Sequence, residues 1–337
     1  MDYTQLKALL ATPKRILLTS HKNPDGDAMG STLGLQHVLN AMGHTTEVIY
    51  PTDFPSFLAW LPGADASITP TSADLKSTEY GRKQVENAEI IFALDFNNLQ
   101  RIDAIGNWIT RSKAVKVLID HHLHPNDFAQ HVLSDTSASS TCELIYDFVV
   151  GIGATEFLDK NAIYCLLTGI LTDTGSFAYA TSPKLFRTVA ALQEAYQIDF
   201  NDLHNQVFNN DSEKRLRLLG YCLTSAMFIF EQYSTAVVIL TQYDYQNLDI
   251  QRGDTEGIVN FMLRMGNIKF AVLFSDQNNN IKFSFRSKGD FDVQAFSSKH
   301  FGGGGHKNAS GGESNLGLMR AWVKFRKALD EYPELKP

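Results

Sequence analysis

The segment VLIDHHLHP, residues 117–125, decides the fold class of this 337-residue chain. A short apolar run ends at Asp120, and His121 and His122 follow it directly. A continuous apolar run of this length predicts a strand buried on both faces, as in a parallel sheet covered by helices. Because the side chains of an extended chain alternate between faces, we expect one of the two histidines to point into a site at the strand end. The other should point elsewhere or lie above that site.

Three more apolar runs of this kind precede the segment, and helical patterns lie between and after the runs. Strands that alternate with helices predict an α/β fold with a mostly parallel sheet covered by helices. The expected strands are RILLTS (15–20), TEVIY (46–50), EIIFALDF (89–96) and AVKVLIDHH (114–122), and the expected helices cover residues 27–43, 139–151 and 158–175.

The pattern changes after about residue 224, where β-like runs dominate. Two of them, IKFAVLFSDQ and IKFSFRSK, are separated by the asparagines 278–280, which indicate a hairpin turn. Helical patterns at 255–265 and 316–332 complete a smaller α+β domain. We therefore predict three parts of the chain, which are an N-terminal domain at 1–185, a helical linker at 186–223 and a C-terminal domain at 224–337.

The glycine-rich segment FGGGGHKNASGG, residues 301–312, is predicted to form a loop inside the second domain. Glycines expose backbone N–H groups without side-chain obstruction, and a phosphate or nucleotide needs such groups. A flexible linker is the alternative interpretation. Because the segment lies within a domain, between a basic and aromatic run and a final helical pattern, we favour a binding role.

The composition is that of an ordinary globular protein, with 44% hydrophobic and 20% charged residues. A net charge of −7 argues against an extended basic surface for long nucleic acids. The three cysteines lie in apolar, helix-like surroundings and indicate buried thiols in a reducing compartment. No stretch of 18 apolar residues and no signal-peptide pattern is present, so we expect no membrane association and a cytoplasmic location.

Acids and histidines recur where the predicted strands and one helix end. Each of them alone is explained by a helix cap or a turn. Because the carboxyl ends of parallel strands converge on one crevice, we expect these side chains to meet there. They are His21, Asp25 and Asp27 in SHKNPDGDAMGS, Asp95 in ALDFNN, Asp120 and His121 in the opening segment, and Asp173 in GILTDTGSF.

All of these aspartates except Asp120 are candidate metal ligands. In one cleft the four carboxylates would repel one another and raise each other's pKa, and such a cluster is unstable without cations. Two divalent ions would neutralise them, and the imidazoles of His21 and His121 could complete the coordination. Mixed carboxylate and imidazole ligands suit Mn²⁺ better than Ca²⁺. No cysteine lies near these motifs in the sequence, which argues against a thiolate zinc site.

Two divalent ions about 3.5–4 Å apart can clamp a phosphoryl group, which is the chemistry of phosphoester hydrolysis. One histidine of the pair would then bind a metal. The other, His122, would contact the phosphoryl oxygens or protonate the leaving group. Asp120 would orient one of the histidines.

Two further features each allow two roles. Ser139, Ser140 and Thr141 open a predicted helix, where they could bind a phosphate, although simple N-capping is the interpretation that we favour. Arg101 could reach a phosphate or could equally lie on a helix surface.

The motifs SHKNPDGDAMGS, LDFNN, DHH and TDTGSF, in this order, resemble those of the DHH phosphoesterases. The segment FRSKGDFDVQAFSSKHFGGGGHKNASGG resembles the DHH-associated C-terminal domain, and the length is similar to the bacterial oligoribonuclease (nanoRNase) type. The resemblance implies one metal site formed by His21, Asp25 and Asp95, a second formed by Asp27, Asp95, His121 and Asp173, a catalytic His122 close to the scissile phosphate, and substrate binding by Arg286, Gly303, Gly304, Gly305 and His306.

The resemblance also implies an enzyme that hydrolyses short oligoribonucleotides as an exonuclease, together with 3′-phosphoadenosine 5′-phosphate. A phosphodiesterase that takes the dinucleotide pApA from cyclic-di-AMP turnover is the alternative, and the motifs do not separate the two. An inorganic pyrophosphatase should lack the GGGGH segment, and a processive DNA exonuclease of the RecJ type would need a basic track. A non-enzymatic binding module would not need four intact acidic motifs. The expected partners are short RNA and nucleotides; we infer no stable protein partner, and a homodimer stays open.

Overall fold

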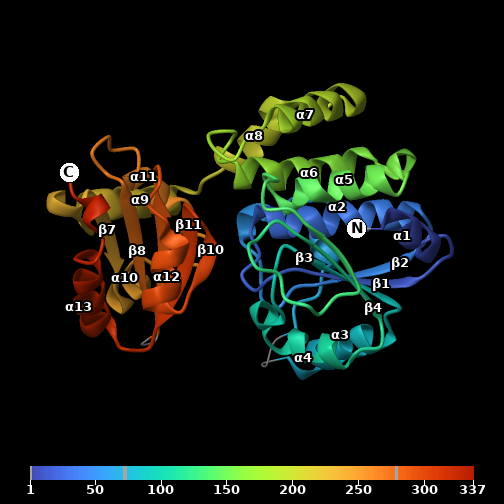
Figure 1. Cartoon of the computed structure of the whole chain (residues 1–337), viewed down its shortest axis with the longest axis horizontal. Helices are drawn as coiled ribbons and strands as arrows, with labels where there is room; N and C mark the ends of the chain where they lie inside the picture. The colour runs from blue at the N-terminus through green and yellow to red at the C-terminus, as the bar shows by residue number, and fades with distance from the viewer. Residues whose placement is uncertain (1, 71–73, 278–279) are drawn as a thin grey trace. The chain divides into compact units, whose positions relative to one another are not determined.

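The computed structural model describes residues 2–70, 74–277 and 280–337. The chain divides into two compact units, Met1–Asn210 and Asp211–Pro337, each with its own sheet (Figure 1). The boundary falls inside the segment predicted as a helical linker, 186–223. Its first helices belong to the first unit and its last helix to the second. The hairpin turn predicted at 278–280 lies largely outside the described residues.

The sheet of the first unit has five parallel strands in the order β2-β1-β3-β4-β5. This confirms the predicted α/β class. The four predicted strands are present, and the fifth was not predicted because it is short and largely half-exposed. The strands are β1 (Arg15–Thr19), β2 (Thr45–Ile49), β3 (Ile90–Leu94), β4 (Val115–Asp120) and β5 (His131–Ser134).

Helices cover both faces of this sheet (Figure 1). One core joins α2, α5 and α6 to strand residues such as Phe92 and Ile119, and the other joins α3 and α4 to Ile91 and Leu118. Neighbouring strand residues therefore enter opposite cores, which explains why the runs are apolar throughout. The helices are α1 (Tyr3–Leu9), α2 (Gly26–Ala41), α3 (Leu75–Asn87), α4 (Asp103–Arg111), α5 (Thr141–Gly151), α6 (Lys160–Asp173), α7 (Pro183–Tyr196) and α8 (Phe200–Phe208), with short 3₁₀ turns η1 (Ser56–Leu58), η2 (Ala64–Ala66), η3 (Leu99–Ile102) and η4 (Thr155–Phe157).

The strand order of the first unit has a switch point between β1 and β3, because the chain moves from β1 outward to β2 and then returns to the other side of β1. In open parallel sheets, ligands bind beside the carboxyl ends of the strands at such a point. The turn after β1 and the residue after β3 carry the predicted ligands His21, Asp25 and Asp95. The topology therefore brings together motifs that are far apart in the sequence.

The second unit contains a six-stranded mixed sheet in the order β10-β11-β9-β8-β7-β6, in which β7 and β8 pair in parallel and the other neighbouring strands pair antiparallel. This agrees with the predicted α+β character. The elements are α9 (Glu213–Thr224), β6 (Met227–Phe230), η5 (Glu231–Tyr233), β7 (Thr235–Leu240), α10 (Gln242–Asn247), α11 (Ile258–Met262), β8 (Phe270–Gln277), β9 (Asn280–Ser287), α12 (Val293–Phe301), β10 (Gly304–His306), β11 (Ala309–Ser314), α13 (Leu318–Leu329) and η6 (Pro333–Leu335).

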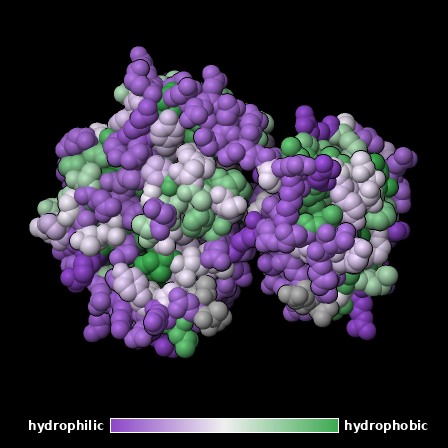
Figure 2. All heavy atoms as spheres, turned by 180° about the vertical axis from the view of Figure 1, so that it is seen from behind, coloured by the Kyte–Doolittle hydropathy of each residue, from purple (hydrophilic) through white to green (hydrophobic). Residues whose placement is uncertain are grey.

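Two separate cores lie on the two faces of this second sheet. An aromatic core beneath α12 and α13 includes Phe270, Phe285 and Phe325, and a smaller core beneath α9 and α11 includes Ala271 and Leu273. Hydrophilic residues cover much of the visible face of each unit (Figure 2). Among the described residues, no helix combines the length and apolar character that spanning a membrane requires.

The glycine-rich segment 301–312 differs from the prediction of a loop. After the end of α12 at Phe301, the segment contains β10 and the first part of β11, two antiparallel strands joined by a short turn, and β11 also pairs with β9. Glycine-rich strands have almost no side chains to show an alternating pattern, so their pairing rests on backbone hydrogen bonds that the sequence does not display. The helix α12 was also not predicted.

Candidate metal centre and substrate surface

The turn between β1 and α2 places three of the predicted ligands. Asp25 is the N-cap of α2, and its Oδ1 accepts hydrogen bonds from the backbone N–H groups of Asp27 (3.1 Å) and Ala28 (3.0 Å). Asp25 therefore has the capping role that its position suggested, while its Oδ2 lies 3.9 Å from His21 Nε2. Asp27 follows in the first turn of the helix and is almost fully buried.

A first group of candidate ligands consists of His21, Asp25 and Asp95, whose ligand atoms lie within 4.8 Å of one another. His21 Nε2 is 3.3 Å from Asp95 Oδ2. The Nδ1 atom of His21 lies 2.8 Å from the carbonyl oxygen of Lys22, which can only accept, so Nδ1 carries the proton. Burial lowers the pKa of His21. A neutral ring with its Nε2 lone pair directed at the acids is the form that binds a metal.

A second group consists of Asp27, Asp95 and His121. His121 Nε2 lies 3.7 Å from Asp27 Oδ2 and 3.7 Å from Asp95 Oδ1. It lies closer, at 3.3 Å, to Oδ2 of Asp173, the last residue of α6. The structure therefore brings all six predicted ligands close together. Their assignment to two metal ions stays a prediction.

Asp95 belongs to both groups. Its Oδ2 faces His21 of the first group, and its Oδ1 faces His121 of the second. Its backbone has a φ of 63°, a left-handed conformation that aspartate and asparagine tolerate better than most residues. Burial raises the pKa of its carboxyl well above the ordinary value, and the neighbouring Asp27 and Asp25 raise it further. The Arg101 charge opposes this, but less strongly. The negative charge of the carboxylates in this cluster therefore exceeds the positive charge of the neighbouring Arg101. Divalent ions would offset the remaining negative charge, and they fit this set of carboxylate and imidazole donors.

The start of α5 contacts two of these acids. Asp27 accepts hydrogen bonds from the backbone N–H groups of Thr141 (2.6 Å) and Cys142 (2.9 Å), and the Thr141 hydroxyl donates to Asp95 Oδ1 (3.0 Å). Ser140 is the N-cap and accepts from Glu143, as the capping interpretation expected. The phosphate-binding alternative is not supported at these two N–H groups, because they are bound to a carboxylate of the protein itself.

Cys142 also corrects the expectation that no cysteine lies near the motifs. It is 115 residues from Asp27 in sequence, yet its N–H binds that carboxylate and its thiol lies 3.7 Å from the Asp27 carbonyl oxygen. Burial, followed by the Asp27 charge, raises the pKa of the thiol well above its ordinary value. The thiol contacts a backbone carbonyl, and Cys142 is in none of the groups of candidate ligands among the described residues, which is the structural argument against a thiolate site.

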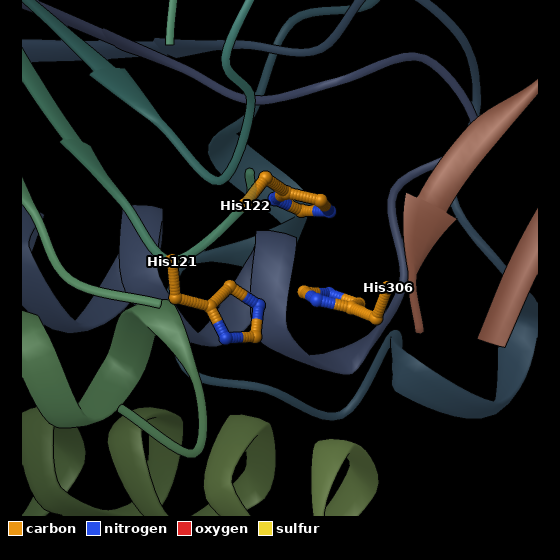
Figure 3. Close-up of side chains that lie close together, drawn as sticks. All are labelled: His121, His122 and His306. Atoms are coloured by element: carbon orange, nitrogen blue, oxygen red, sulfur yellow. The ribbon is translucent and has the colours of Figure 1, made fainter. Parts of the chain in front are cut away.

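His122 is held by Asp120, the last residue of β4. Its Nδ1 donates to Asp120 Oδ1 at 2.8 Å, and the Asp120 side chain is fully buried. The rings of His121 and His122 lie side by side, with centroids 5.1 Å apart and planes inclined by 79° (Figure 3). His121 Nε2 lies 3.7 Å and His122 Nδ1 3.6 Å from Asp95 Oδ1, so neither histidine points away from the acids. Burial lowers the pKa of His122 well below the ordinary value, and the Arg101 charge lowers it further. Asp120 therefore fixes the tautomer of a neutral His122.

Arg101 lies in η3, half-buried, and its carbonyl oxygen accepts from the backbone N–H of Lys22. Its charge lowers the pKa of both His21 and His122, so it lies close enough to the cluster to act on it. The sequence allowed Arg101 either a contact to a phosphate or a place on a helix surface. Its position favours the role at the site.

In the second unit, Arg286 and His306 belong to one row across three strands. Arg286 on β9 pairs with Ala309 on β11, which pairs with His306 on β10. Directly paired residues point to the same face, and two strand spacings separate the outer ones by about 10 Å. The next row on this face is Ser284, Gly311 and Gly304. Between Arg286 and His306 this face therefore carries small residues, Ala309 in the same row and Gly311 and Gly304 in the next.

The three predicted glycines differ in their surroundings. A side chain at Gly303 would overlap the carbonyl oxygen of Gly311 and the hydroxyl of Ser297, and Gly305 has a φ of 146° with Ala309 directly beside it. At Gly304, a Cβ would meet no described atom within 4 Å. Packing of the chain therefore explains Gly303 and Gly305, whereas nothing in the fold requires a glycine at 304.

The first unit is thus an α/β domain with a candidate metal centre at its topological switch point, and the second unit carries an open sheet surface with an arginine and a histidine. The chain belongs to the DHH family: residues 15–170 match the DHH family, N-terminal domain, and residues 233–332 match the DHHA1 domain.

The chain is similar to a bifunctional oligoribonuclease and PAP phosphatase, NrnA, of Thermus thermophilus, at 27% identity over 96% of this chain and 92% of that protein. It is 22% identical to a cyclic-di-AMP phosphodiesterase, GdpP, of Bacillus subtilis, over 98% of this chain but 49% of that protein. The crystal structure of an exopolyphosphatase-related protein from Bacteroides fragilis is 35% identical, with a TM-score of 0.91 over 99% of this chain and 96% of the other.

Proposed function

We propose that this protein is a two-metal phosphoesterase that hydrolyses short oligoribonucleotides, as an exonuclease, and 3′-phosphoadenosine 5′-phosphate. The observation that carries the proposal is the position of Asp95 between two groups of candidate ligands. A relative that spans nearly the full length of both chains is named for these two activities, which supports the substrate class.

In this proposal, His21, Asp25 and Asp95 hold one divalent ion, and Asp27, Asp95, His121 and Asp173 hold the other. Mn²⁺ is the ion that suits this mixture of imidazole and carboxylate best. When bound, the two ions would neutralise the acids and polarise the phosphoryl group. The protein's part is to hold the ligands in a fixed arrangement, and the partners of His21 and Asp27 support this.

His122 is proposed to contact the phosphoryl oxygens or to protonate the leaving oxygen. Its hydrogen bond to Asp120 keeps the Nδ1 proton in place and leaves Nε2 as the atom that can accept or deliver a proton. Asp120 acts through His122 as its orienting partner. A neutral His122 is the form that can first bind a proton and then release it.

Arg286 and His306 are proposed to hold the nucleotide, and the small residues between them support this, because they leave the face between the two side chains uncovered by bulky groups. Arginine suits phosphate recognition because its planar fork donates two parallel hydrogen bonds. A net charge of −7 gives no support to a track for a long strand, so short substrates are expected. The domain limits proposed from sequence, 1–185, 186–223 and 224–337, assign this surface to the substrate domain.

The alternative substrate is pApA from cyclic-di-AMP turnover. A relative named cyclic-di-AMP phosphodiesterase is less similar, and this chain spans about half of that protein, so we place this alternative second. Because pApA is itself an RNA dinucleotide, an enzyme for very short RNA can accept it without a separate role. We also propose a cytoplasmic location, which the three free, buried thiols support.

A product profile would test the proposal. The enzyme with Mn²⁺ is given labelled RNA of two to ten nucleotides, pApA, 3′-phosphoadenosine 5′-phosphate and inorganic pyrophosphate. We expect the highest kcat/KM on the shortest RNA, release of inorganic phosphate from 3′-phosphoadenosine 5′-phosphate, and little turnover of pyrophosphate. Equal rates on all RNA lengths, or a preference for pyrophosphate, would contradict the assignment.

A further inference from the structure

The first turn of α5 has an unusual set of acceptors for its N–H groups. The first N–H groups of a helix have no partner within the helix and normally bind water, a capping side chain or a ligand. Here Thr141 and Cys142 donate theirs to Asp27, at 2.6 and 2.9 Å, and Glu143 donates to the cap residue Ser140. The positive end of the helix is therefore directed at a candidate metal ligand.

The hydroxyl of Thr141 adds a contact to a second acid. It donates to Oδ1 of Asp95 at 3.0 Å, and the Thr141 side chain is fully buried. Asp27 and Asp95 are 114 and 46 residues away from Thr141 in sequence, and they belong to α2 and to the turn after β3. Thr141 thus contacts both carboxylates of the second group of ligands, Asp27 and Asp95.

The packing around Asp27 leaves its carboxylate little freedom to turn. Gly169 of α6 lies against it, and a Cβ there would be 2.8 Å from Asp27 Oδ1 and would overlap the Cys142 sulfur. Both carboxylate oxygens are bound to N–H groups of α5. The orientation of Asp27 is therefore set by α5 and α6 and does not depend on an ion.

We propose that Thr141 is a positioning residue of the candidate metal centre: its hydroxyl holds Asp95, and the helix turn that it opens holds Asp27, in the arrangement that the second ion needs. The inference rests on the proposed function, because it assumes that these carboxylates bind metal. It assigns to Thr141 no contact with substrate. Hydrogen-bond partners of metal ligands typically change metal affinity by about 10–100-fold.

The test is a Mn²⁺ titration of the metal-free protein, in which the electron paramagnetic resonance signal of free Mn²⁺ reports the number and affinity of bound ions. Thr141→Val keeps the shape and the N–H group but removes the hydroxyl, and Thr141→Ser restores a hydroxyl. We expect wild type and Thr141→Ser to bind two ions similarly. We expect Thr141→Val to bind one of the two about 10–100-fold more weakly.

Kinetics and a matched control separate positioning from general damage. Ser140→Ala removes the helix cap but neither contact to the acids, so it should lower the melting temperature and leave Mn²⁺ affinity unchanged. With excess Mn²⁺, Thr141→Val should regain most of its kcat with an unchanged KM for 3′-phosphoadenosine 5′-phosphate. If Thr141→Val does not fold, Thr141→Ala is measured in the same way.

Three results would overturn the inference. Two ions bound by Thr141→Val as tightly as by wild type would remove the role of the hydroxyl while leaving the proposed function intact. A raised KM with unchanged Mn²⁺ affinity would show a substrate contact and no positioning role. If the wild-type protein binds no divalent ion, the two-metal function fails and this inference fails with it.

Discussion

In the first unit, Asp27, Asp95 and His121 are 1%, 2% and 4% exposed, and each lies within reach of several partners that fix its orientation. In the second unit, Arg286 and His306 are half-exposed on a sheet face with small neighbours. Removing acids from water is costly, so the first group persists only with compensating partners or ions. Half-exposed side chains stay partly hydrated, so their desolvation costs less. Changes in the buried cluster should therefore alter the chemistry, and changes on the open surface should alter affinity.

Removal of divalent ions should have the largest effect. After treatment with a chelator and exchange into metal-free buffer, turnover of every nucleotide substrate should fall to the background level, because the acids lose the charges that they need. Adding Mn²⁺ should restore it. The control is the same buffer with chelator already saturated with Mn²⁺. Full turnover of any nucleotide after complete metal removal would show that the buried acidic cluster of the first unit does not act through bound ions.

Substitution of Asp95 should come next, and the left-handed φ of this residue decides the variant. Asn tolerates that conformation and Ala does so less well, so Asp95→Asn removes the charge with little backbone strain. We expect kcat to fall by about 1000-fold or more on 3′-phosphoadenosine 5′-phosphate and on bis-p-nitrophenyl phosphate, because several kcal/mol of metal-dependent stabilisation is lost. The metal-free melting temperature should rise, since a like charge leaves a buried acidic cluster.

The matched control for this variant is Asp103→Asn. Asp103 also has a positive φ, of 47°, but its side chain is half-exposed and pairs with Lys22 at 3.5 Å. Its substitution should leave kcat and metal binding close to wild type. A fast Asp95→Asn enzyme, or a slow Asp103→Asn enzyme, would show that the effect does not come from a shared metal ligand.

Substitutions on the open surface should have smaller effects that depend on the substrate. Arg286→Ala and His306→Ala should raise KM for nucleotides by about 10–100-fold, the range expected for a lost hydrogen bond to a charged group. Bis-p-nitrophenyl phosphate has no nucleoside to hold, so its kinetics should change little. Arg326→Ala is the control, because that guanidinium lies over Phe230 and Trp322 at the opposite core. Unchanged nucleotide kinetics in both variants would remove the substrate role of this surface.

Sequence reasoning succeeded where a residue's role follows from its place at the end of a strand. The continuous apolar run before His121 indicates a buried strand, and the carboxyl ends of parallel strands converge. The sequence alone therefore predicts that His21, Asp95 and His121 lie close together. The same reasoning could not find Thr141. A serine or threonine at a helix start indicates capping, and only the packing of α2 against α5 shows that Thr141 contacts acids.

The parts that escaped prediction share a physical cause, which is that backbone contacts or distant neighbours determine them. The strand β5 is four residues long, too short for a periodic pattern. The strands β10 and β11 pair through the backbone of glycines, so the segment looked like a loop. Cys142 seemed remote from the site because only tertiary packing brings it to Asp27.

Gly304, the first residue of β10, and Gly303, which precedes that strand, provide the smallest and most discriminating test of the open surface. Gly304→Ala should fit without a clash and should stabilise the protein by about 0.5–1 kcal/mol, because glycine within a strand is less favourable than alanine. If the nucleotide lies on this surface, the added methyl group should nevertheless raise KM by about tenfold or less.

Gly303→Ala should instead lower the free energy of unfolding by about 1–3 kcal/mol, because its Cβ would overlap the Gly311 carbonyl oxygen. Thermal unfolding and nucleotide kinetics on the two variants measure both quantities. A gain in stability together with a loss of affinity at position 304 cannot arise from damage to the fold. A Gly304→Ala enzyme with unchanged KM would show that the substrate lies elsewhere on the second unit.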